Sequence, residues 1–399
     1  MTRRRFNVLC IMDFFLPGYL GGGPITTIAN MRKELVEQVA LDIFTRDRDV
    51  GCASQYTGIV PNEWVEDPDG LIYYASPKNF GAAGFLRVLA NGNFDAVYLN
   101  SFFSPKASIL PILALALFNH KLPILLAPRG EFSPGALAIS PYRKMIYIAI
   151  TRLLGVYRGV FWHASTTREA EDIHRIFPKV NKRIFVAADS VLPESHEPGF
   201  DVSRRAPGCL RVVFVSRISP KKNLDGLIKI LGLVSLPIQL DIYGPIEDEP
   251  YWELCTDLIS KLPSNINVGV YGPLKPDSVM DTFSQYDLFA FPTHGENFGH
   301  VILESLRAGT PVVVSDQTPW CGDDDGALSV IPAQDVVRWR DALETAANRT
   351  AEEHKLLRDA ALRYANRYVL EAETKKVNLE LFAKVLNFRS DNNGAISDV

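Results

Sequence analysis

The sequence predicts an α/β protein built from two doubly wound domains, each a mostly parallel sheet with helices on both faces. Its 399 residues suffice for two ordinary domains. Short, continuous apolar runs alternate with segments of helical period, as expected for parallel strands that are buried on both faces and joined by helices. The runs form two series, and each opens with a strand followed by a turn rich in glycine or basic residues.

The first series lies in the N-terminal half and the second in the C-terminal half. The candidate strands of the first series are Asn7–Phe14, Ala40–Phe44, Ile72–Tyr74, Ala96–Leu99, Pro123–Ala127, Val160–His163 and Ile184–Val186. Those of the second series are Arg211–Ser216, Gln239–Tyr243, Ile266–Val270, Leu288–Phe291 and Pro311–Ser315. A polar, proline-bearing stretch separates the two series. We therefore expect one Rossmann-like domain over residues 1–190, a linker over 191–208, a second such domain over 209–365 and a last helix over 366–390.

Composition and charge limit the classes of function. Hydrophobic residues make up 47% of the chain and charged residues 22%, which is typical of globular proteins. Residues 1–190 hold 21 Lys+Arg against 16 Asp+Glu, and residues 191–399 hold 21 against 30, so a basic half precedes an acidic one. This favours an N-terminal surface that meets something anionic, and we expect no nucleic-acid partner. Five scattered cysteines without a CxxC pair and no visible signal peptide favour the cytoplasm.

Residues 287–316 are the most informative stretch, because they predict strand, glycine-bearing loop, helix, tight turn and strand. Glu296 falls in the loop, and Glu304 falls in the second turn of a helix that begins near Gly299. The N-terminus of a helix presents unpaired N–H groups and attracts an anion such as phosphate. Carboxylates beside it are placed to accept hydrogen bonds from hydroxyl groups. Phosphate donors and hydroxyl acceptors in one loop indicate a nucleotide-sugar.

A glycine run, Gly21-Gly22-Gly23-Pro24, follows the first predicted strand and opens a helix. Glycines let the backbone approach a ligand closely, and proline suits the first helical turn. A tight structural turn is the alternative, but it needs one glycine rather than three. The run is not a GxGxxG fingerprint, so it does not indicate a dinucleotide site.

Two basic residues follow the first strand of the second series. Arg217 ends that strand and Lys222 begins the next helix, so both project from the carboxyl end of the sheet, where ligands of such folds bind. They could stabilise the negative charge of a diphosphate leaving group without a metal. For the neighbouring Lys221 we expect an ordinary solvated surface charge.

These segments together resemble the retaining glycosyltransferases of family 4, which have the GT-B fold. The resemblance rests on the glycine loop, the Arg217 and Lys222 segment, and the spacing of Glu296 and Glu304, and it covers most of the chain. Residues 128–131 and 161–167 resemble segments of members that build bacterial cell-surface polysaccharides. The resemblance implies two domains facing across a cleft, an N-terminal domain that binds the acceptor, and a last helix that crosses back to it.

The resemblance also assigns roles to residues. Arg217, Lys222 and Glu296 would be catalytic: the two cations would hold the donor diphosphate, and Glu296 would contact hydroxyls of the transferred sugar. Glu304 would accept hydrogen bonds from the ribose. The remaining donor-binding residues are Gly22 and Gly23 at the phosphates, Asn297, Phe298 and Gly299 at the distal phosphate or sugar, and Gly272 and Leu274 at the base.

The sequence departs from the family pattern in one loop. Many members carry a histidine where this chain has Arg129, Gly130 and Glu131. We therefore predict Arg129, Glu131 and His163 as acceptor contacts, although His163 has the alternative of a structural role and Glu131 that of pairing with Arg129. Three acidic clusters, at residues 47–49, 67–69 and 323–325, lie in polar stretches, and we expect solvated loops rather than a metal site.

The stretch 142–158 combines basic and aromatic residues with an apolar helical face. An ordinary amphipathic domain helix is the favoured interpretation, and a helix that rests on an anionic membrane is the alternative.

The sequence thus predicts a cytoplasmic glycosyltransferase, peripheral at the inner face of the membrane in the second case. It would transfer a sugar from a nucleoside-diphosphate-sugar to a glycan or lipid-linked glycan, with retention and without a metal or other cofactor. A nucleotide-sugar epimerase and a non-catalytic sugar-nucleotide-binding partner are the alternatives.

Overall fold

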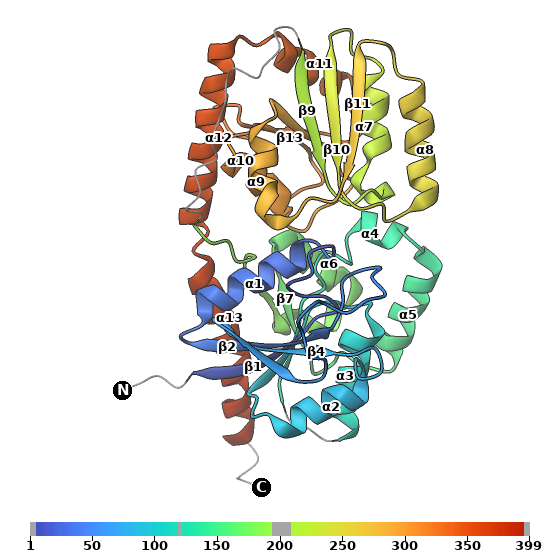
Figure 1. Ribbon diagram of the computed structural model, residues 1–399. Helices are drawn as coiled ribbons and strands as arrows, with labels where there is room; N and C mark the ends of the chain where they lie inside the picture. Colours follow the sequence, from blue (N-terminus) through green and yellow to red (C-terminus); the bar gives the residue numbers. More distant parts are fainter. Residues whose placement is uncertain (1–4, 119–121, 194–208, 395–399) are drawn as a thin grey trace. The chain divides into compact units, whose positions relative to one another are not determined.

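A computed structural model describes residues 5–118, 122–193 and 209–394 of the protein, with side chains described up to residue 387 (Figure 1). Its internal contacts divide the chain into two compact units. Unit 1 comprises residues 1–192 and 372–399, and unit 2 comprises residues 193–371. Most of the expected linker, residues 194–208, lies outside the described part of the chain.

Unit 1 contains an eight-stranded sheet with the strand order β3-β4-β2-β1-β5-β6-β7-β8. Neighbouring strands are parallel except for β3 and β4, which form an antiparallel hairpin. The strands are β1 (Phe6–Ile11), β2 (Val39–Arg46), β3 (Trp64–Asp67), β4 (Gly70–Ala75), β5 (Ala96–Leu99), β6 (Ile124–Leu126), β7 (Phe161–Ala164) and β8 (Ile184–Val186). The sequence did not predict β3. The buried guanidinium of Arg32 donates to both oxygens of Asp67, at 2.8 and 2.9 Å, and so fixes this hairpin.

The helices of unit 1 cover both faces of its sheet. They are α1 (Gly23–Leu35), α2 (Ala82–Asn91), the π-helix η1 (Pro105–Ile109), α3 (Leu110–Leu117), α4 (Pro134–Ala138), α5 (Pro141–Leu153), α6 (Thr167–Ile176), the 3-10 helix η2 (Pro178–Arg183) and α13 (Thr374–Gly394). Helix α1 begins at the glycine run with Pro24 in its first turn. It buries Ile25, Ile28, Met31 and Leu35, which recur at helical spacing on one face.

Alternate residues of the strands feed two separate apolar cores. In β1, Val8 and Cys10 point to the core shared with α1 and α13, whereas Leu9 and Ile11 point to the core shared with α2, α3, α5 and α6. This alternation follows from the two-residue period of a strand. Burial on both faces explains why the sequence shows continuous apolar runs rather than alternating ones.

Unit 2 is a six-stranded, fully parallel sheet with the order β11-β10-β9-β12-β13-β14. Its strands are β9 (Leu210–Val215), β10 (Ile238–Tyr243), β11 (Ile266–Gly272), β12 (Leu288–Phe291), β13 (Val312–Ser315) and β14 (Leu328–Ile331). The sequence did not predict β14, because Ser329 interrupts a four-residue strand that is too short to show a pattern.

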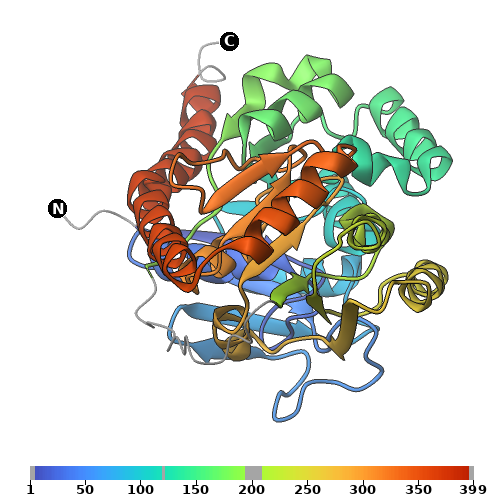
Figure 2. The ribbon, with the colours of Figure 1, turned by 90° about the horizontal axis from the view of Figure 1, so that it is seen from above.

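The helices of unit 2 lie on both sides of its sheet (Figure 2). They are the 3-10 helix η4 (Pro220–Lys222), α7 (Leu224–Leu231), α8 (Glu249–Ser260), α9 (Pro276–Ser284), α10 (His300–Arg307), α11 (Val336–Asn348) and α12 (Ala351–Glu371). Helix α7 contacts α8 and α11, and α10 contacts α9 and α12, so the helices form two layers.

The C-terminal helical segment is broken, although its sequence predicts one long helix. Helix α12 ends at Glu371 in unit 2, and α13 begins at Thr374 in unit 1. Between them, Glu373 has a φ of 41°, in the left-handed region that interrupts a right-handed helix. Helix α13 contacts α1, and Asn378 on it donates 2.9 Å hydrogen bonds to the carbonyls of Ala188 and Thr374.

Candidate functional site

In unit 2 the direction of the strand order changes at β9. Strands β10 and β11 follow on one side of β9, and β12, β13 and β14 follow on its other side. In open parallel sheets, ligands bind outside the carboxyl ends of the strands at such a switch point. The loop after β9 carries Arg217 and Lys222, and the loop after β12 carries Glu296. The fold therefore brings three predicted site residues to one edge of one sheet.

Lys222 and Glu296 form an ion pair at this edge. The Lys222 ammonium donates to Glu296 Oε1, and the two side chains are 10% and 11% exposed. The ammonium also lies 5.5 Å from the centre of the Phe291 ring. Burial raises the pKa of Glu296, but the positive charges of Lys222 and Lys221 outweigh burial and hold that pKa below its ordinary value. Glu296 is therefore a carboxylate at neutral pH, a hydrogen-bond acceptor.

Backbone and side-chain hydrogen bonds clamp the two loops together. Asn223, which has a left-handed φ of 58°, donates from Nδ2 to Pro292 O at 2.8 Å. The amide of His294 donates to Lys221 O at 2.8 Å. Thr293 Oγ1 lies 3.1 Å from Lys221 O and 3.3 Å from Glu296 Oε1. Sequence reasoning missed Asn223 and Thr293; the polar Thr293 directly after a buried strand was the available signal.

Arg217 stands apart from the buried pair. Its guanidinium donates to Glu247 at 2.5 Å, and both side chains are more than two-fifths exposed. It is near enough to contribute to the lowered pKa of Glu296. The sequence grouped Arg217 with Lys222, but the structure gives them different partners and very different exposure.

The loop before α10 has the predicted shape. Gly299 has a φ of 84° and caps a helix that starts at His300, so Glu304 lies one turn into that helix and is half-buried. Phe298 is buried against Trp320 and Tyr368, and its carbonyl accepts a 2.6 Å hydrogen bond from Trp320 Nε1. The Phe298 side chain is thus part of the core, whereas its two neighbours, Asn297 and Gly299, are partly exposed.

Gly272 and Leu274 lie at the end of the edge strand β11. Gly272 has a φ of 74°, and its carbonyl accepts a 2.8 Å hydrogen bond from the amide of Gly244. Leu274 is half-exposed in the following loop. Because β10 lies between β11 and β9, these two residues are at the same sheet edge as Lys222 but on the far strand.

In unit 1 the glycine run turns the chain into α1. Gly22 caps the helix with a φ of 77°, which favours glycine, and Gly23 is the first helical residue. The preceding loop is held by Asp49, whose Oδ2 accepts from the amides of Tyr19 at 2.9 Å and Leu20 at 3.2 Å. The expectation of a solvated loop at residues 47–49 was wrong, because Asp47 and Asp49 are both buried.

The structure does not give His163 an exposed face. Its side chain is fully buried, with Nε2 2.8 Å from Ala187 O and Nδ1 2.6 Å from the Tyr98 hydroxyl. Since a carbonyl accepts, Nε2 carries the proton and Nδ1 accepts from Tyr98. Burial lowers the pKa of His163 to about 4, so the ring is neutral. These partners are those of the structural alternative for His163, and its role as an acceptor contact stays a prediction.

Arg129 and Glu131 are also occupied within unit 1. Arg129 donates to Asp189 at 2.5 Å, to the Tyr98 hydroxyl at 2.7 Å and to Asn100 Oδ1 at 2.8 Å. Glu131 instead accepts from Ser101 Oγ and from the amides at 102 and 103. Both residues therefore hold loops of unit 1 together, and Arg129 does not pair with Glu131. Their contact with an acceptor stays a prediction.

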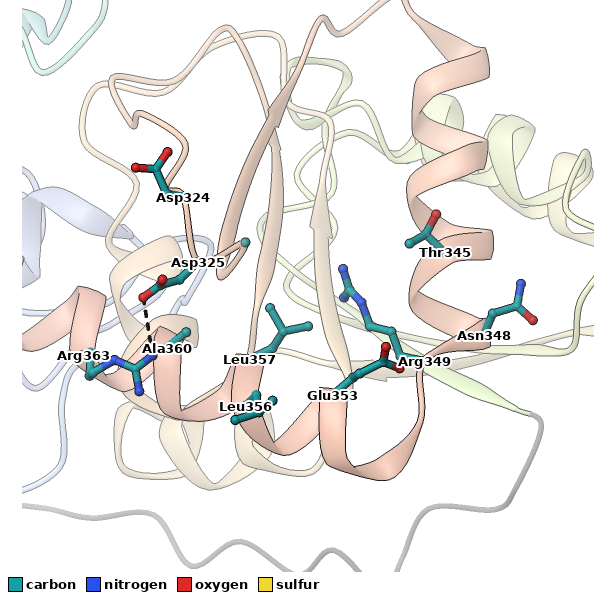
Figure 3. A pocket seen from close by; sticks show the side chains of 11 residues that line it. Asp324, Asp325, Thr345, Asn348, Arg349, Glu353, Leu356, Leu357, Ala360 and Arg363 are labelled. Carbon is teal, nitrogen blue, oxygen red and sulfur yellow. Dashed lines mark hydrogen bonds and ion pairs between the residues drawn. The ribbon is translucent and has the colours of Figure 1, made fainter.

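A pocket of about 750 Å³ lies elsewhere in unit 2, between α11, α12 and the acidic loop at residues 323–326 (Figure 3). It is lined by charged groups, among them the Asp325 and Arg363 pair at 3.4 Å, and by Leu356 and Leu357. It contains none of the predicted site residues. Within the described residues no cluster of three or more His, Cys, Asp or Glu side chains is arranged to hold a metal ion.

Comparisons with known proteins place this site in context. Residues 200–323, which include both loops of the site, match the family model described as "Glycosyl transferases group 1". A D-inositol 3-phosphate glycosyltransferase of Rhodococcus erythropolis is 30% identical over 165 residues, which cover 38% of this chain and 37% of that protein. A protein of the same description from Mycobacteroides abscessus is 26% identical over 335 residues, covering 76% and 72%. The chain thus spans well under two thirds of the Rhodococcus relative.

Solved structures establish the fold. Sucrose-phosphate synthase of Thermosynechococcus elongatus has a TM-score of 0.67 at 14% identity and covers 95% of this chain and 100% of its own. The Anabaena protein HepE, in complex with UDP-glucose, has the same TM-score, identity and coverage. The chain has the GT-B fold of two parallel α/β units, and its second unit carries a region of the group 1 glycosyltransferase type.

Proposed function

We propose that the protein is a glycosyltransferase that moves a hexose-like sugar from a nucleoside-diphosphate-sugar to a hydroxyl of a glycan or lipid-linked glycan. The observation that carries this proposal is the buried Lys222 and Glu296 pair at the switch point of unit 2, inside the matched region. UDP-glucose is the first donor to test, because it is the ligand in the HepE complex.

Each side chain has a role that fits its surroundings. Lys222 has three N–H donors, and Glu296 accepts one of them, so a donor phosphate could accept from the others. Arg217, which is exposed, would turn from Glu247 to the same diphosphate. Glu296 is ionised and would accept hydrogen bonds from sugar hydroxyls, while Glu304 would do so for the ribose. Fixed cations would stabilise the leaving diphosphate in the role that a metal has in other transferases.

We propose a same-face reaction with retention of configuration. The bond from the anomeric carbon to the diphosphate oxygen breaks, and the acceptor oxygen forms its bond on the face that the diphosphate leaves. A phosphate oxygen takes the acceptor proton. An α-linked donor should then give an α-linked product.

Polysaccharide assembly at the cytoplasmic face of a membrane belongs to the same proposal. The resemblance of residues 128–131 and 161–167 to cell-surface polysaccharide enzymes supports it. In residues 5–118, 122–193 and 209–394, every helix is too short or too polar to span a membrane.

The test begins with a panel of UDP- and GDP-sugars screened by thermal shift, followed by turnover with acceptor glycans. Glu296→Gln should lower kcat on the order of 10²-fold, because it removes a charge that stabilises the reacting sugar. The matched control is Glu253→Gln, at an exposed position of α8, which should leave kcat unchanged. The product anomer is read by NMR, with EDTA present and absent.

Several outcomes would overturn parts of the proposal. A β-linked product from an α-linked donor excludes retention, and activity abolished by EDTA excludes the metal-free role of the cations. A donor that is epimerised without acceptor indicates the epimerase. Tight donor binding with neither transfer nor hydrolysis indicates a non-catalytic partner.

A further inference from the structure

Helix α5 has an inner face that accounts for its packing in unit 1. Ile148 and Thr151 are buried on this face, and Tyr147 lies beside them. The Tyr147 hydroxyl is 2.6 Å from that of Tyr157, and its ring packs 5.2 Å from that of Phe102. These contacts join α5 to the aromatic core, so the fold needs nothing apolar from the opposite face of the helix.

The opposite face is nevertheless apolar. Tyr142, Met145, Ile146, Ile150 and Leu153 recur at helical spacing, and they are 84%, 53%, 60%, 51% and 85% exposed. We call these five residues the α5 stripe. An ordinary surface helix is polar on its solvent face, and a continuous exposed apolar strip marks an interaction surface. The structure thus departs from the ordinary amphipathic helix that the sequence favoured.

The charge of the chain segment that carries the α5 stripe has one sign. The chain contains no Asp or Glu between Glu131 and Glu169, and Arg143, Arg152 and Arg158 in this interval are exposed. An apolar strip flanked by arginines is the composition of helices that lie in the interface of an anionic bilayer. A protein partner that covered such a strip would have to supply carboxylates to each flank, whereas anionic headgroups supply negative charge along the whole helix.

The position of α5 in the chain relates this surface to the carboxyl edge of the unit 1 sheet. The loop after β6 leads through α4, which contacts α5, directly into the helix. In a parallel sheet this edge is where ligands bind. A bilayer at α5 would therefore lie next to the edge at which an acceptor would be expected.

We propose that the α5 stripe and its flanking arginines dock unit 1 on the headgroup layer of an anionic phospholipid membrane. The helix lies in the membrane plane, inserts the stripe among the acyl-chain ends and keeps its arginines at the phosphates. In combination with the proposed function, this assigns a lipid-linked glycan as the acceptor class; the docking itself does not depend on the transfer reaction.

The test is co-sedimentation of the full chain with vesicles of phosphatidylcholine alone and of phosphatidylcholine with phosphatidylglycerol. Wild type should bind the anionic vesicles and lose binding as salt is raised. The variant I146S/I150S/L153S should bind at least tenfold more weakly, because three inserted side chains are lost. R143S/R152S should lose about fivefold per charge. The matched control is L356S/L370S, which changes two exposed leucines of α12 in unit 2.

Circular dichroism melts and binding of UDP, measured without vesicles, show whether each variant is folded. Failure of nucleotide binding in wild type would count against the proposed function and leave the vesicle result intact. Equal binding of wild type to neutral and anionic vesicles, or equal binding by the stripe and control variants, would overturn the docking proposal. So would a wild-type dimer that the stripe variant converts to a monomer without any vesicle binding.

Discussion

Each unit buries a cation beside a carboxylate at the carboxyl ends of its parallel strands, and the two pairs are built differently. In unit 1, Arg129 and Asp189 are 5% and 4% exposed. In unit 2, Lys222 and Glu296 are 10% and 11% exposed. Arg129 also donates to the Tyr98 hydroxyl and to Asn100 Oδ1. For the Lys222 ammonium, Glu296 is the one hydrogen-bond partner among the described residues.

The number of partners separates a pair that holds the fold from one that could serve a ligand. A guanidinium whose N–H groups all donate to residues of its own unit fixes loops in place. Removing these hydrogen bonds would lower the free energy of unfolding. An ammonium has three donors, so one carboxylate leaves capacity for phosphate oxygens. We infer that the unit 1 pair is structural and that the unit 2 pair is held ready for substrate.

Breaking the unit 1 pair should have the largest effect. Arg129→Met leaves the Asp189 carboxylate buried without its cation and should lower the free energy of unfolding by about 3–5 kcal/mol. Urea denaturation followed by circular dichroism measures it. The control Arg363→Met removes a guanidinium that is 64% exposed beside Asp325 and should cost at most about 1 kcal/mol. Similar losses in the two variants would contradict the structural assignment of Arg129.

Breaking the unit 2 pair should act on ligand affinity. Lys222→Ala should weaken binding of free UDP by about 2 kcal/mol, roughly 30-fold, as expected for a charge-assisted contact. Isothermal titration calorimetry measures the affinity. Lys221→Ala is the matched control, because it removes the same charge one residue away, and it should have a smaller effect. Unchanged UDP affinity in Lys222→Ala would refute the phosphate role of this residue.

The smallest expected effect is a difference in pH dependence between the two units. The charges of Lys222 and Lys221 hold the pKa of Glu296 below 4.5 against the effect of burial. Its contribution to stability is therefore complete above pH 4.5 and is lost as the pH falls through its folded pKa. Burial raises the pKa of Glu169 in unit 1 above 4.5, despite hydrogen bonds from the amides of Ser165 and Gly130. Stability from this group falls as the pH rises from 4.5 through its folded pKa.

Urea midpoints between pH 3 and 7 should reveal these opposite slopes. Glu296→Gln should remove part of the rise in stability up to pH 4.5, and Glu169→Gln part of the decline above it. The slope rather than the absolute midpoint is the readout, since both substitutions also alter hydrogen bonds. Slopes of the same sign for the two positions would contradict the assigned environments.

Much of the fold could be predicted because local pattern and global structure agree. The runs that became β1, β5 and β12 are continuous apolar segments, as expected for strands that are buried on both faces. The strands β3 and β14 were missed, since one carries two acids and the other is interrupted by Ser329. The break at Glu373 was missed as well, because φ at a single residue leaves no periodic signal.

Less of the site could be predicted, because its residues meet only in three dimensions. Lys222 and Glu296 are 74 positions apart, and their contact depends on β9 and β12 being neighbours in the sheet. Arg129, Glu131 and His163 are polar residues at strand ends, and nothing local shows that each finds its partners within unit 1. The exposure of the α5 stripe likewise depended on which face of helix α5 packs against the aromatic core.

The sequence by itself determined most of the strands and helices and the loops that carry charge, since periodicity and turn chemistry act over a few residues. The tertiary structure alone decided which charged side chains have their hydrogen-bonding groups occupied within the fold and which could still bind a ligand. The reason is that burial and hydrogen-bond partners come from segments far apart in the chain, so the same arginine or lysine can hold a fold or hold a substrate.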